Sequence, residues 1–152
     1  ASLLRGEALL ASNVLEVAVP VGNPARVTSL SDLGRPGLKV VLCATPVPCG
    51  AAADAAFAKA HVRPSVVSRE VDVKATLAKV RLGEADAAVV YASDVASAGG
   101  TVTGIPIPAA QNVTLRYPIL RLRDDPATQA YVDFVAGAGA RKTIQSFGFG
   151  PP

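Results

Sequence analysis

The sequence predicts an α/β fold with a mainly parallel sheet. Short runs rich in Val, Ile and Ala alternate along the chain with segments of helical character, which is the pattern of βαβ units. Residues 39–43 (KVVLC) and 87–91 (AAVVY) are apolar throughout, as in parallel strands that are buried on both faces. Half of the 152 residues are hydrophobic, so a packed core is expected within one compact domain or two small lobes.

The first expected elements are a strand and a short helix. Residues 13–20 (NVLEVAVP) alternate and are rich in β-branched side chains, which predicts a strand. The dipeptide 23–24 (NP) then marks a turn. Residues 29–32 (SLSD) have the spacing of a capping box and begin a short helix that ends at Gly34 or Pro36.

Strands and helices alternate in the middle of the chain. Residues 39–43 form the next expected strand, and the Ala-rich segment 50–61 predicts a helix with Phe57 as its largest apolar anchor. A brief β-branched strand is expected at 65–68. Asp72 is the expected N-cap of the helix that follows.

The helix after Asp72 has a clear apolar face. Val73, Leu77 and Val80 fall at positions i, i+4 and i+7, so they lie on one side of the helix. Gly83 is expected to end this helix. The side that holds the three apolar residues should therefore pack on the sheet.

A buried strand is expected next, at 87–91. A helical turn begins at 93–94 (SD) and ends at 99–100 (GG), because paired glycines stop a helix. Two further strands are expected at 102–107 and 114–122, where β-branched residues return.

Two helices are expected to close the chain. The pair 125–126 (DP) marks the start of the first, since Pro is favoured at the first helical position. Tyr131, Phe134 and Val135 are predicted to form its apolar face. The last helix is expected at 140–147.

The two cysteines, Cys43 and Cys49, lie six positions apart. We favour a disulfide that closes a short loop, which would imply an oxidising compartment, over two buried free thiols. This spacing is not that of a usual zinc pair, and His61 is the only histidine, so no structural metal site is expected. Cys49 and His61 stand at the two ends of a helix of roughly 16 Å, which is too long for a Cys–His catalytic pair.

Charge and hydropathy argue against nucleic-acid binding and against a membrane-spanning segment. The formal charge is +3, and the basic residues are scattered without interleaved aromatic residues, so nucleic-acid binding is disfavoured. No apolar run reaches the ~18 residues that a membrane span requires.

Three segments place anion-binding groups at the ends of expected strands: 48–50 (PCG), 72–74 (DVK) and 90–94 (VYASD). The first two are helix starts, which offer backbone N–H groups without intrahelical partners and the positive end of the helix dipole. Ligands bind beyond the carboxyl ends of strands in open α/β sheets. The residues therefore predict a receptor for a small anion, and no catalytic residue is proposed.

Four longer segments resemble one known family. They are GLKVVLCATPVPCG, VDVKATLAKVRLGEADAAVVYASDV, YPILRL and YVDFVAGAGARKTIQSFGF. Together they are similar to the periplasmic molybdate-binding proteins of ABC transporters over about residues 13–149. The most specific parts are the V-P-C-G turn and the block G-E-A-D-A-x-x-V-Y-x-S-D. The resemblance implies a periplasmic-binding-protein-like fold of type II, with two α/β lobes joined by crossing strands.

This resemblance also implies a domain organisation. Residues 21–104 would form one complete lobe, lobe II. Residues 1–20 and 105–152 would form a remnant of lobe I, with crossing strands and C-terminal helices. The family's N-terminal segment, which supplies serine donors to the other half of the site, is expected to be absent from the chain.

The ligand implied by the resemblance is tetrahedral molybdate or tungstate, held by neutral donors. Cys49 and Val73 match the family positions that offer backbone N–H groups, and Tyr91 matches the tyrosine whose hydroxyl donates to the anion. A smaller residue such as Ala is commoner at the Cys49 position, but the contact is made by the main chain. No cofactor is expected, and no metal beyond the oxyanion itself. The supporting residues are Pro48, Gly50 and Asp72.

The function implied by the resemblance is that of the extracytoplasmic solute-binding component of a molybdate or tungstate ABC importer. Its partner would be a membrane permease, and its location periplasmic or extracellular, either free or lipid-anchored. The alternative is the effector-binding domain of a LysR-type transcription regulator, which would have reduced cysteines. A thiol hydrolase using Cys49 is a weaker hypothesis. Self-association is a further expectation, because a lobe without its N-terminal strands would expose apolar surface and sheet edge.

Overall fold

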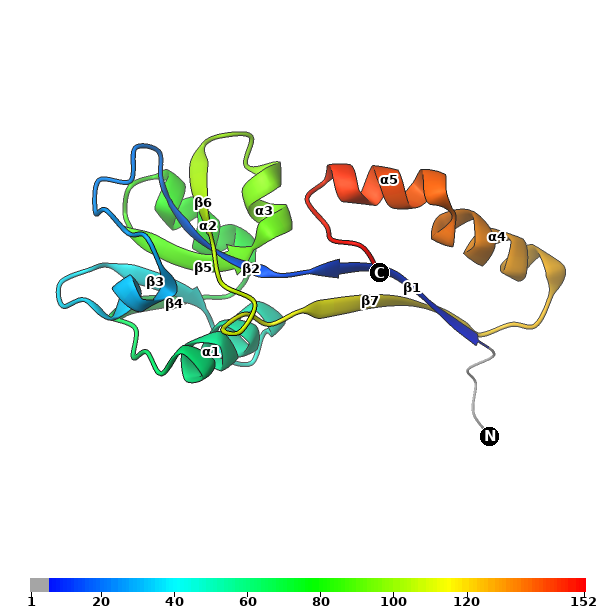
Figure 1. Ribbon diagram of the computed structural model, residues 1–152, viewed down its shortest axis with the longest axis horizontal. Helices are drawn as coiled ribbons and strands as arrows, with labels where there is room; N and C mark the ends of the chain where they lie inside the picture. The colour runs from blue at the N-terminus through cyan, green and yellow to red at the C-terminus, as the bar shows by residue number, and fades with distance from the viewer. Residues whose placement is uncertain (1–5) are drawn as a thin grey trace. The chain divides into compact units, whose positions relative to one another are not determined.

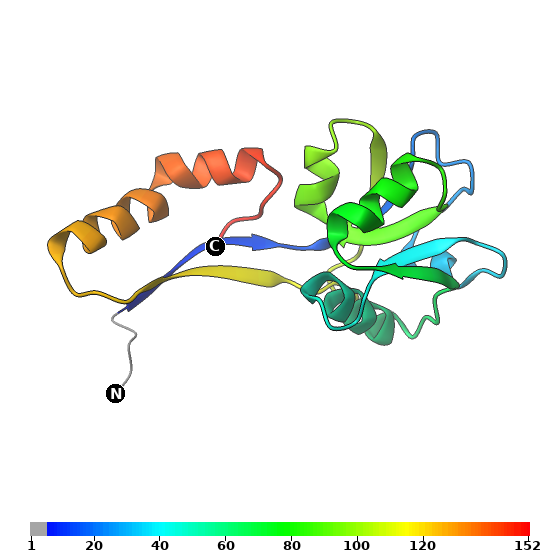
Figure 2. The ribbon, with the colours of Figure 1, turned by 180° about the vertical axis from the view of Figure 1, so that it is seen from behind.

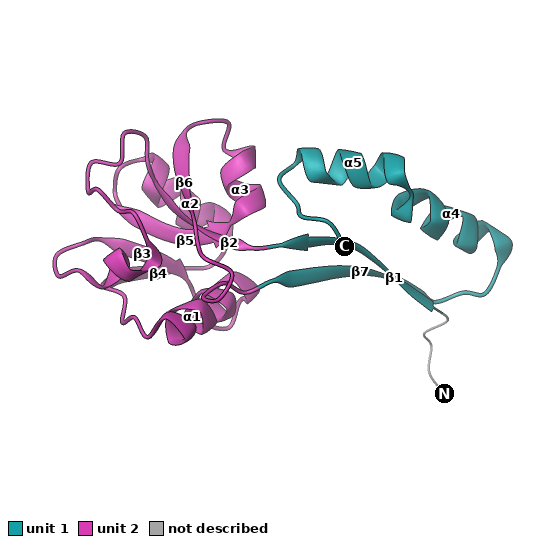
Figure 3. Ribbon diagram, viewed as in Figure 1, with its two compact units in different colours: residues 1–13, 114–152 teal, residues 14–113 magenta. Residues whose placement is uncertain are grey.

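The computed structural model describes residues 6–152, and the chain divides into two compact units (Figure 3). Unit 1 comprises residues 1–13 and 114–152, and unit 2 comprises residues 14–113. Both units combine strands and helices, so the predicted α/β class is confirmed. Unit 2 includes the whole of segment 21–104, which the sequence predicts to be a complete lobe.

Unit 2 is built on a five-stranded sheet with the order β4-β3-β5-β2-β6. Its strands are β2 (Leu15–Pro20), β3 (Val40–Cys43), β4 (Val66–Glu70), β5 (Ala87–Tyr91) and β6 (Val102–Pro106). Strand β3 pairs in parallel with β4 and β5, whereas β2 pairs antiparallel with β5 and β6. Every strand except β2 therefore points the same way, so the predicted mainly parallel sheet is confirmed.

Helices cover both faces of this sheet (Figures 1 and 2). They are η1 (Leu30–Gly34), α1 (Pro48–Ala60), α2 (Val73–Arg81) and α3 (Ala92–Ser97). Helix α1 lies on one face and inserts Phe57, which is buried as predicted. Helices α2 and α3 lie on the other face, over a cluster that includes Val41, Ala88 and Val90. No helix within residues 6–152 has the length and hydropathy needed to cross a membrane.

Helix α2 begins and packs as the sequence predicts. The Asp72 carboxylate accepts a hydrogen bond from the Ala75 N–H at 2.8 Å and is therefore the N-cap. Val80 is fully buried, and Val73 and Leu77 pack partly buried against the same core cluster. The predicted apolar face of this helix is thus confirmed.

Unit 1 pairs two strands and adds two helices. Strands β1 (Gly6–Asn13) and β7 (Leu115–Arg121) are antiparallel, and helices α4 (Pro126–Ala136) and α5 (Ala138–Ser146) follow. Asp125 caps α4 by accepting the Thr128 N–H at 2.9 Å, and Pro126 occupies the first turn, as predicted. Strand β1 begins seven residues before the strand expected at 13–20, and β2 begins separately at Leu15.

The predicted apolar face of α4 is wrong for Tyr131 and Phe134, whereas Val135 is half-buried. Val132 is the buried residue, at 9% exposure, whereas Tyr131 and Phe134 are 62% and 73% exposed. At about 100° per residue, Phe134 lies nearly opposite Val132 and Tyr131 lies about a quarter of a turn away from it, so neither is on the side that carries Val132. The side that packs is the one that carries Val132.

Glu16 on β2 gives a pH-dependent prediction. Its half-buried carboxylate lies against Gly104 and close to Val95 of α3, and burial raises the pKa of this carboxyl above its ordinary value of 4.5. A raised folded-state pKa penalises the ionised form, so this group lowers stability as pH rises above 4.5. We expect Glu16→Gln to raise Tm at neutral pH by roughly 2 °C.

The gain in Tm from Glu16→Gln should disappear below pH 4.5, where the Glu16 carboxyl is protonated in both the folded and the unfolded state. Thermal unfolding of both proteins across this pH range measures it. Glu7→Gln, at an exposed position of β1, is the control and should leave Tm unchanged. A gain of equal size in acid and at neutral pH would contradict the assignment to ionisation.

Candidate functional site

The carboxyl ends of three parallel strands meet at one edge of the unit 2 sheet. Cys43 at the end of β3 is in register with Glu70 at the end of β4, and the Ala44 N–H donates to the Glu70 carbonyl at 2.8 Å. Strand β5 ends at this edge with Tyr91. Helices α1, α2 and α3 each follow one of these strands, so their first turns gather at the same edge.

A disulfide joins Cys43 to Cys49, with Cα atoms 5.8 Å apart. The favoured prediction is confirmed, and the alternative of two free thiols is wrong. Both sulfurs are bonded, so Cys49 offers no thiolate for a hydrolase. No group of three or more His, Cys, Asp or Glu side chains suited to a metal ion occurs in the part of the chain that the structure describes.

The start of α1 lies tightly against the end of β3. Pro48 is exposed, whereas Cys49 and Gly50 are buried. A Cβ atom on Gly50 would collide with the Ala44 carbonyl oxygen and lie 2.8 Å from the carbonyl oxygen of Cys43. Only glycine allows this approach. The Cys49 N–H has no hydrogen-bond partner among the described residues.

The start of α2 lies beside the disulfide. Thr76 is fully buried, and its hydroxyl has two possible acceptors. They are the Cys43 sulfur at 3.5 Å and the Asp72 carbonyl at 2.9 Å. The Val73 N–H has no partner within residues 6–152. The first turns of α1 and α2 are thus held together through the disulfide and Thr76.

Tyr91 is half-buried at the end of β5, and its N–H donates to Asp94 at 3.2 Å. Asp94 is therefore a cap at the start of α3. Burial raises the pKa of the Asp94 carboxyl, while the Tyr91 N–H and the charge of Lys74 act against that rise. Val73 packs on the cluster that holds Val90, which brings the start of α2 towards this strand end.

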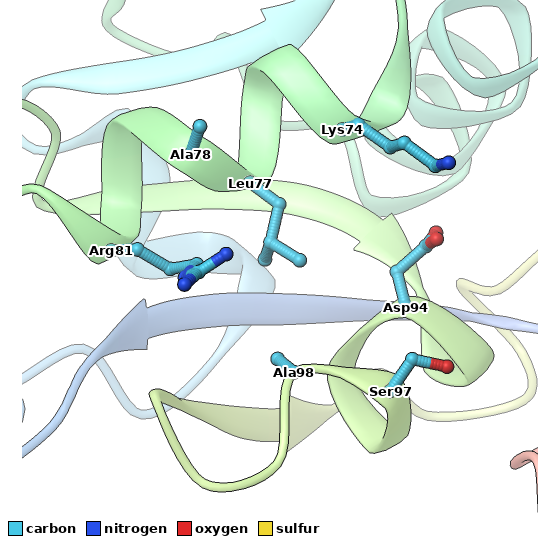
Figure 4. Close-up of a pocket in the computed structure, with 7 residues that line it drawn as sticks. All are labelled: Lys74, Leu77, Ala78, Arg81, Asp94, Ser97 and Ala98. Carbon is cyan, nitrogen blue, oxygen red and sulfur yellow. The ribbon is translucent and has the colours of Figure 1, made fainter.

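A neighbouring hollow of about 260 Å³ lies between α2 and α3 (Figure 4). The Lys74 and Asp94 side chains extend towards the same end of it. Cys49, Val73 and Tyr91 are not among its lining residues, so this hollow is distinct from the predicted anion site. It is lined by Lys74, Leu77, Ala78, Arg81, Asp94, Ser97 and Ala98.

The structure also reveals residues beside the site that sequence reasoning missed. Arg69 of β4 forms an ion pair with Asp54 of α1 at 2.7 Å and donates to the Cys43 carbonyl at 3.0 Å. The Thr45 hydroxyl, within the disulfide loop, donates to Asp54 at 3.0 Å. No sequence signal marks this pair, because its members lie 15 positions apart on different elements.

Comparison with known proteins identifies relatives of the whole chain. The family model described as bacterial extracellular solute-binding protein matches residues 2–150. The chain is 36% identical over 156 residues to the molybdate-binding protein ModA of Mycobacterium tuberculosis (strain ATCC 25618 / H37Rv). That alignment covers 100% of the chain and 60% of ModA, so the chain spans about three fifths of this relative's length.

Solved structures confirm the fold. The substrate-binding domain of a putative molybdenum ABC transporter from Clostridium difficile superposes with a TM-score of 0.80 at 22% identity, over 96% of the chain and 66% of that domain. The regulatory domain of HypT, a LysR-type regulator from Salmonella typhimurium, gives a TM-score of 0.63 at 11% identity, over 91% of the chain and 66% of that domain. Both likenesses show the fold alone. The periplasmic-binding-protein-like fold implied by the sequence is thus confirmed, and the match over residues 2–150 shows that the chain belongs to the bacterial extracellular solute-binding protein family.

Proposed function

We propose that the chain serves as the extracytoplasmic solute-binding component of a molybdate or tungstate ABC importer. The main support comes from Cys49 and Val73, which lie in the first turns of α1 and α2 at the sheet edge that also holds Tyr91. Their N–H groups have no hydrogen-bond partners among the described residues. The 36% identity to a molybdate-binding protein also supports the proposal.

Neutral donors suit this ligand. Molybdate is a dianion whose oxygens only accept hydrogen bonds, so a site of N–H and O–H donors can satisfy it. A protonated oxyanion such as hydrogen phosphate would turn its own O–H towards a donor. Each hydrogen bond to a charged acceptor contributes roughly 1.5–3 kcal/mol. Several such bonds can hold the ion without a Lys or Arg ligand.

The supporting residues act on the two helix starts. Pro48 fixes the backbone at the first position of α1, and Gly50 allows α1 to approach the end of β3. Asp72 caps α2 by accepting the Ala75 N–H, which leaves the Val73 N–H available to a ligand. The function of all three is therefore to orient the donors.

Further parts of the proposal follow from the family. The partner of such a receptor is the membrane permease of an ABC importer, and the family's description as extracellular supports a periplasmic or extracellular location, free or lipid-anchored. We propose that 21–104 is one full lobe, and that 1–20 and 105–152 belong to a second lobe. The regulator alternative has only the likeness of fold to the HypT regulatory domain in its favour, and the disulfide opposes its reduced cysteines.

Calorimetric titration with molybdate tests this function. We expect the native chain to bind molybdate in preference to sulfate and phosphate. Tyr91→Phe should weaken binding by about 10- to 100-fold, because one hydrogen bond to a charged acceptor is lost. Tyr131→Phe, at an exposed position of α4, is the matched control and should bind as the native chain does. Equal affinities for the native chain and Tyr91→Phe would remove Tyr91 from the site.

A further inference from the structure

We propose that Arg69 and Asp54 are positioning residues that hold the Cys49 N–H in its anion-binding orientation. The proposal rests on the proposed function, because it takes this N–H as a ligand of the oxyanion. Neither residue is assigned a contact with the anion. They act on the loop 44–48, which the disulfide closes.

The Arg69 guanidinium joins three elements at once. Its Nη2 donates to Asp54 Oδ1 at 2.7 Å, and its Nη1 donates to Asp54 Oδ2 at 3.3 Å and to the Cys43 carbonyl at 3.0 Å. Arg69 lies on β4, Asp54 on α1 and Cys43 at the end of β3. A planar guanidinium with paired donors fixes direction as well as distance. It therefore sets how α1 is placed relative to the strand that precedes it.

The same carboxylate holds the loop. Asp54 Oδ2 accepts the Thr45 hydroxyl at 3.0 Å, and Thr45 lies inside the disulfide loop. The disulfide fixes the ends of this loop, while Thr45 fixes its first half. The loop then enters α1 through Pro48, directly before the Cys49 N–H. The direction of that N–H thus depends on both attachments.

Charge and exposure fit a positioning role. Arg69 and Asp54 carry opposite charges in a close pair, so they order the loop without adding net charge beside the anion. Each side chain is 34% exposed, and ion pairs at such positions contribute little to global stability. A variant that breaks the pair should therefore fold, and its effect should be confined to the loop.

Arg69→Gln tests the proposal by two independent readouts. The first is hydrogen exchange at the Gly50 and Ala51 amides, which donate to the Val47 carbonyl at 3.0 and 3.1 Å and report on the first turn of α1. The second is molybdate affinity by calorimetry. We expect exchange to accelerate at these amides and molybdate affinity to fall about tenfold. Losses of this size follow when residues that orient the ligands of a metal ion are replaced. Thr45→Val should have the same effects to a smaller degree.

Lys79→Gln is the matched control, since it breaks a 2.7 Å ion pair with Glu84 elsewhere in unit 2. It should change neither readout. Native exchange and affinity in Arg69→Gln would overturn the proposal, and so would faster exchange spread evenly through unit 2. If the native chain does not bind molybdate, the proposed function fails. The positioning of α1 by Arg69 is then decided by exchange at the Gly50 and Ala51 amides alone.

Discussion

Replacing Asn112 by Ala is expected to lower the free energy of unfolding by about 3 kcal/mol. The Asn112 side chain is buried and makes four hydrogen bonds. Its Oδ1 accepts the N–H groups of Leu15 and Val113 at 2.9 and 2.7 Å, and its Nδ2 donates to the carbonyls of Leu15 and Ile107 at 2.9 and 3.1 Å. Leu15 is fully buried, so truncation leaves its N–H and carbonyl without partners.

Urea denaturation of the native and variant chains measures this loss from the shift of the midpoint. Asn112→Asp should be at least as damaging at neutral pH as Asn112→Ala, because it would bury a carboxylate oxygen against the Leu15 and Ile107 carbonyl oxygens to which Nδ2 donates. A loss below about 0.5 kcal/mol in Asn112→Ala, the range of ordinary surface substitutions, would contradict the structural role.

Gly50→Ala is expected to cost about 3 kcal/mol of stability and to abolish molybdate binding. The added Cβ would overlap the Ala44 carbonyl, with the carbonyl carbon 2.6 Å away, and both neighbours are backbone atoms that cannot rotate aside. Helix α1 must then move away from the end of β3. That movement displaces the Cys49 N–H, so affinity and stability are lost together.

Gly139→Ala provides the matched control for this substitution. Gly139 lies within α5, and a Cβ atom there would meet no atom within 4 Å. Alanine favours helix by up to about 1 kcal/mol over glycine, so this variant should be as stable as the native chain or more so. Thermal unfolding and molybdate titration of both variants give the comparison. Native stability in Gly50→Ala would contradict the close contact between α1 and the end of β3.

Local signals explain why so much of unit 2 could be predicted from sequence. Asp72 is a good N-cap and precedes a helix with one apolar face, so both signals predict the same helix. The segment 87–91 is apolar throughout, which predicts a buried strand. The placement of Cys49, Val73 and Tyr91 at one edge followed from the parallel direction of the strands that precede them. The disulfide was predictable because a six-residue separation can bring two Cα atoms within bonding range.

The elements that could not be predicted depend on partners distant in sequence. Strand β1 has the sequence GEALLASN, whose Ala, Leu and Glu residues favour helix, and its pairing with β7 decides its conformation. Helix α4 has apolar residues on both sides, so the sequence did not reveal that Val132 faces inwards. Arg69 and Asp54 meet only because β4 and α1 are neighbours. These contacts come from tertiary structure, which local patterns do not encode.

An amide-resolved NMR titration of the native chain with molybdate would locate the anion site. We expect the amide signals of Cys49 and Val73 to show the largest saturable shifts, because their N–H groups become donors to the anion. Sulfate and phosphate at the same concentrations should shift them less. Shifts concentrated instead on Lys74, Arg81 and Ser97, which line the neighbouring hollow, with Cys49 and Val73 unmoved, would contradict the assignment of the site.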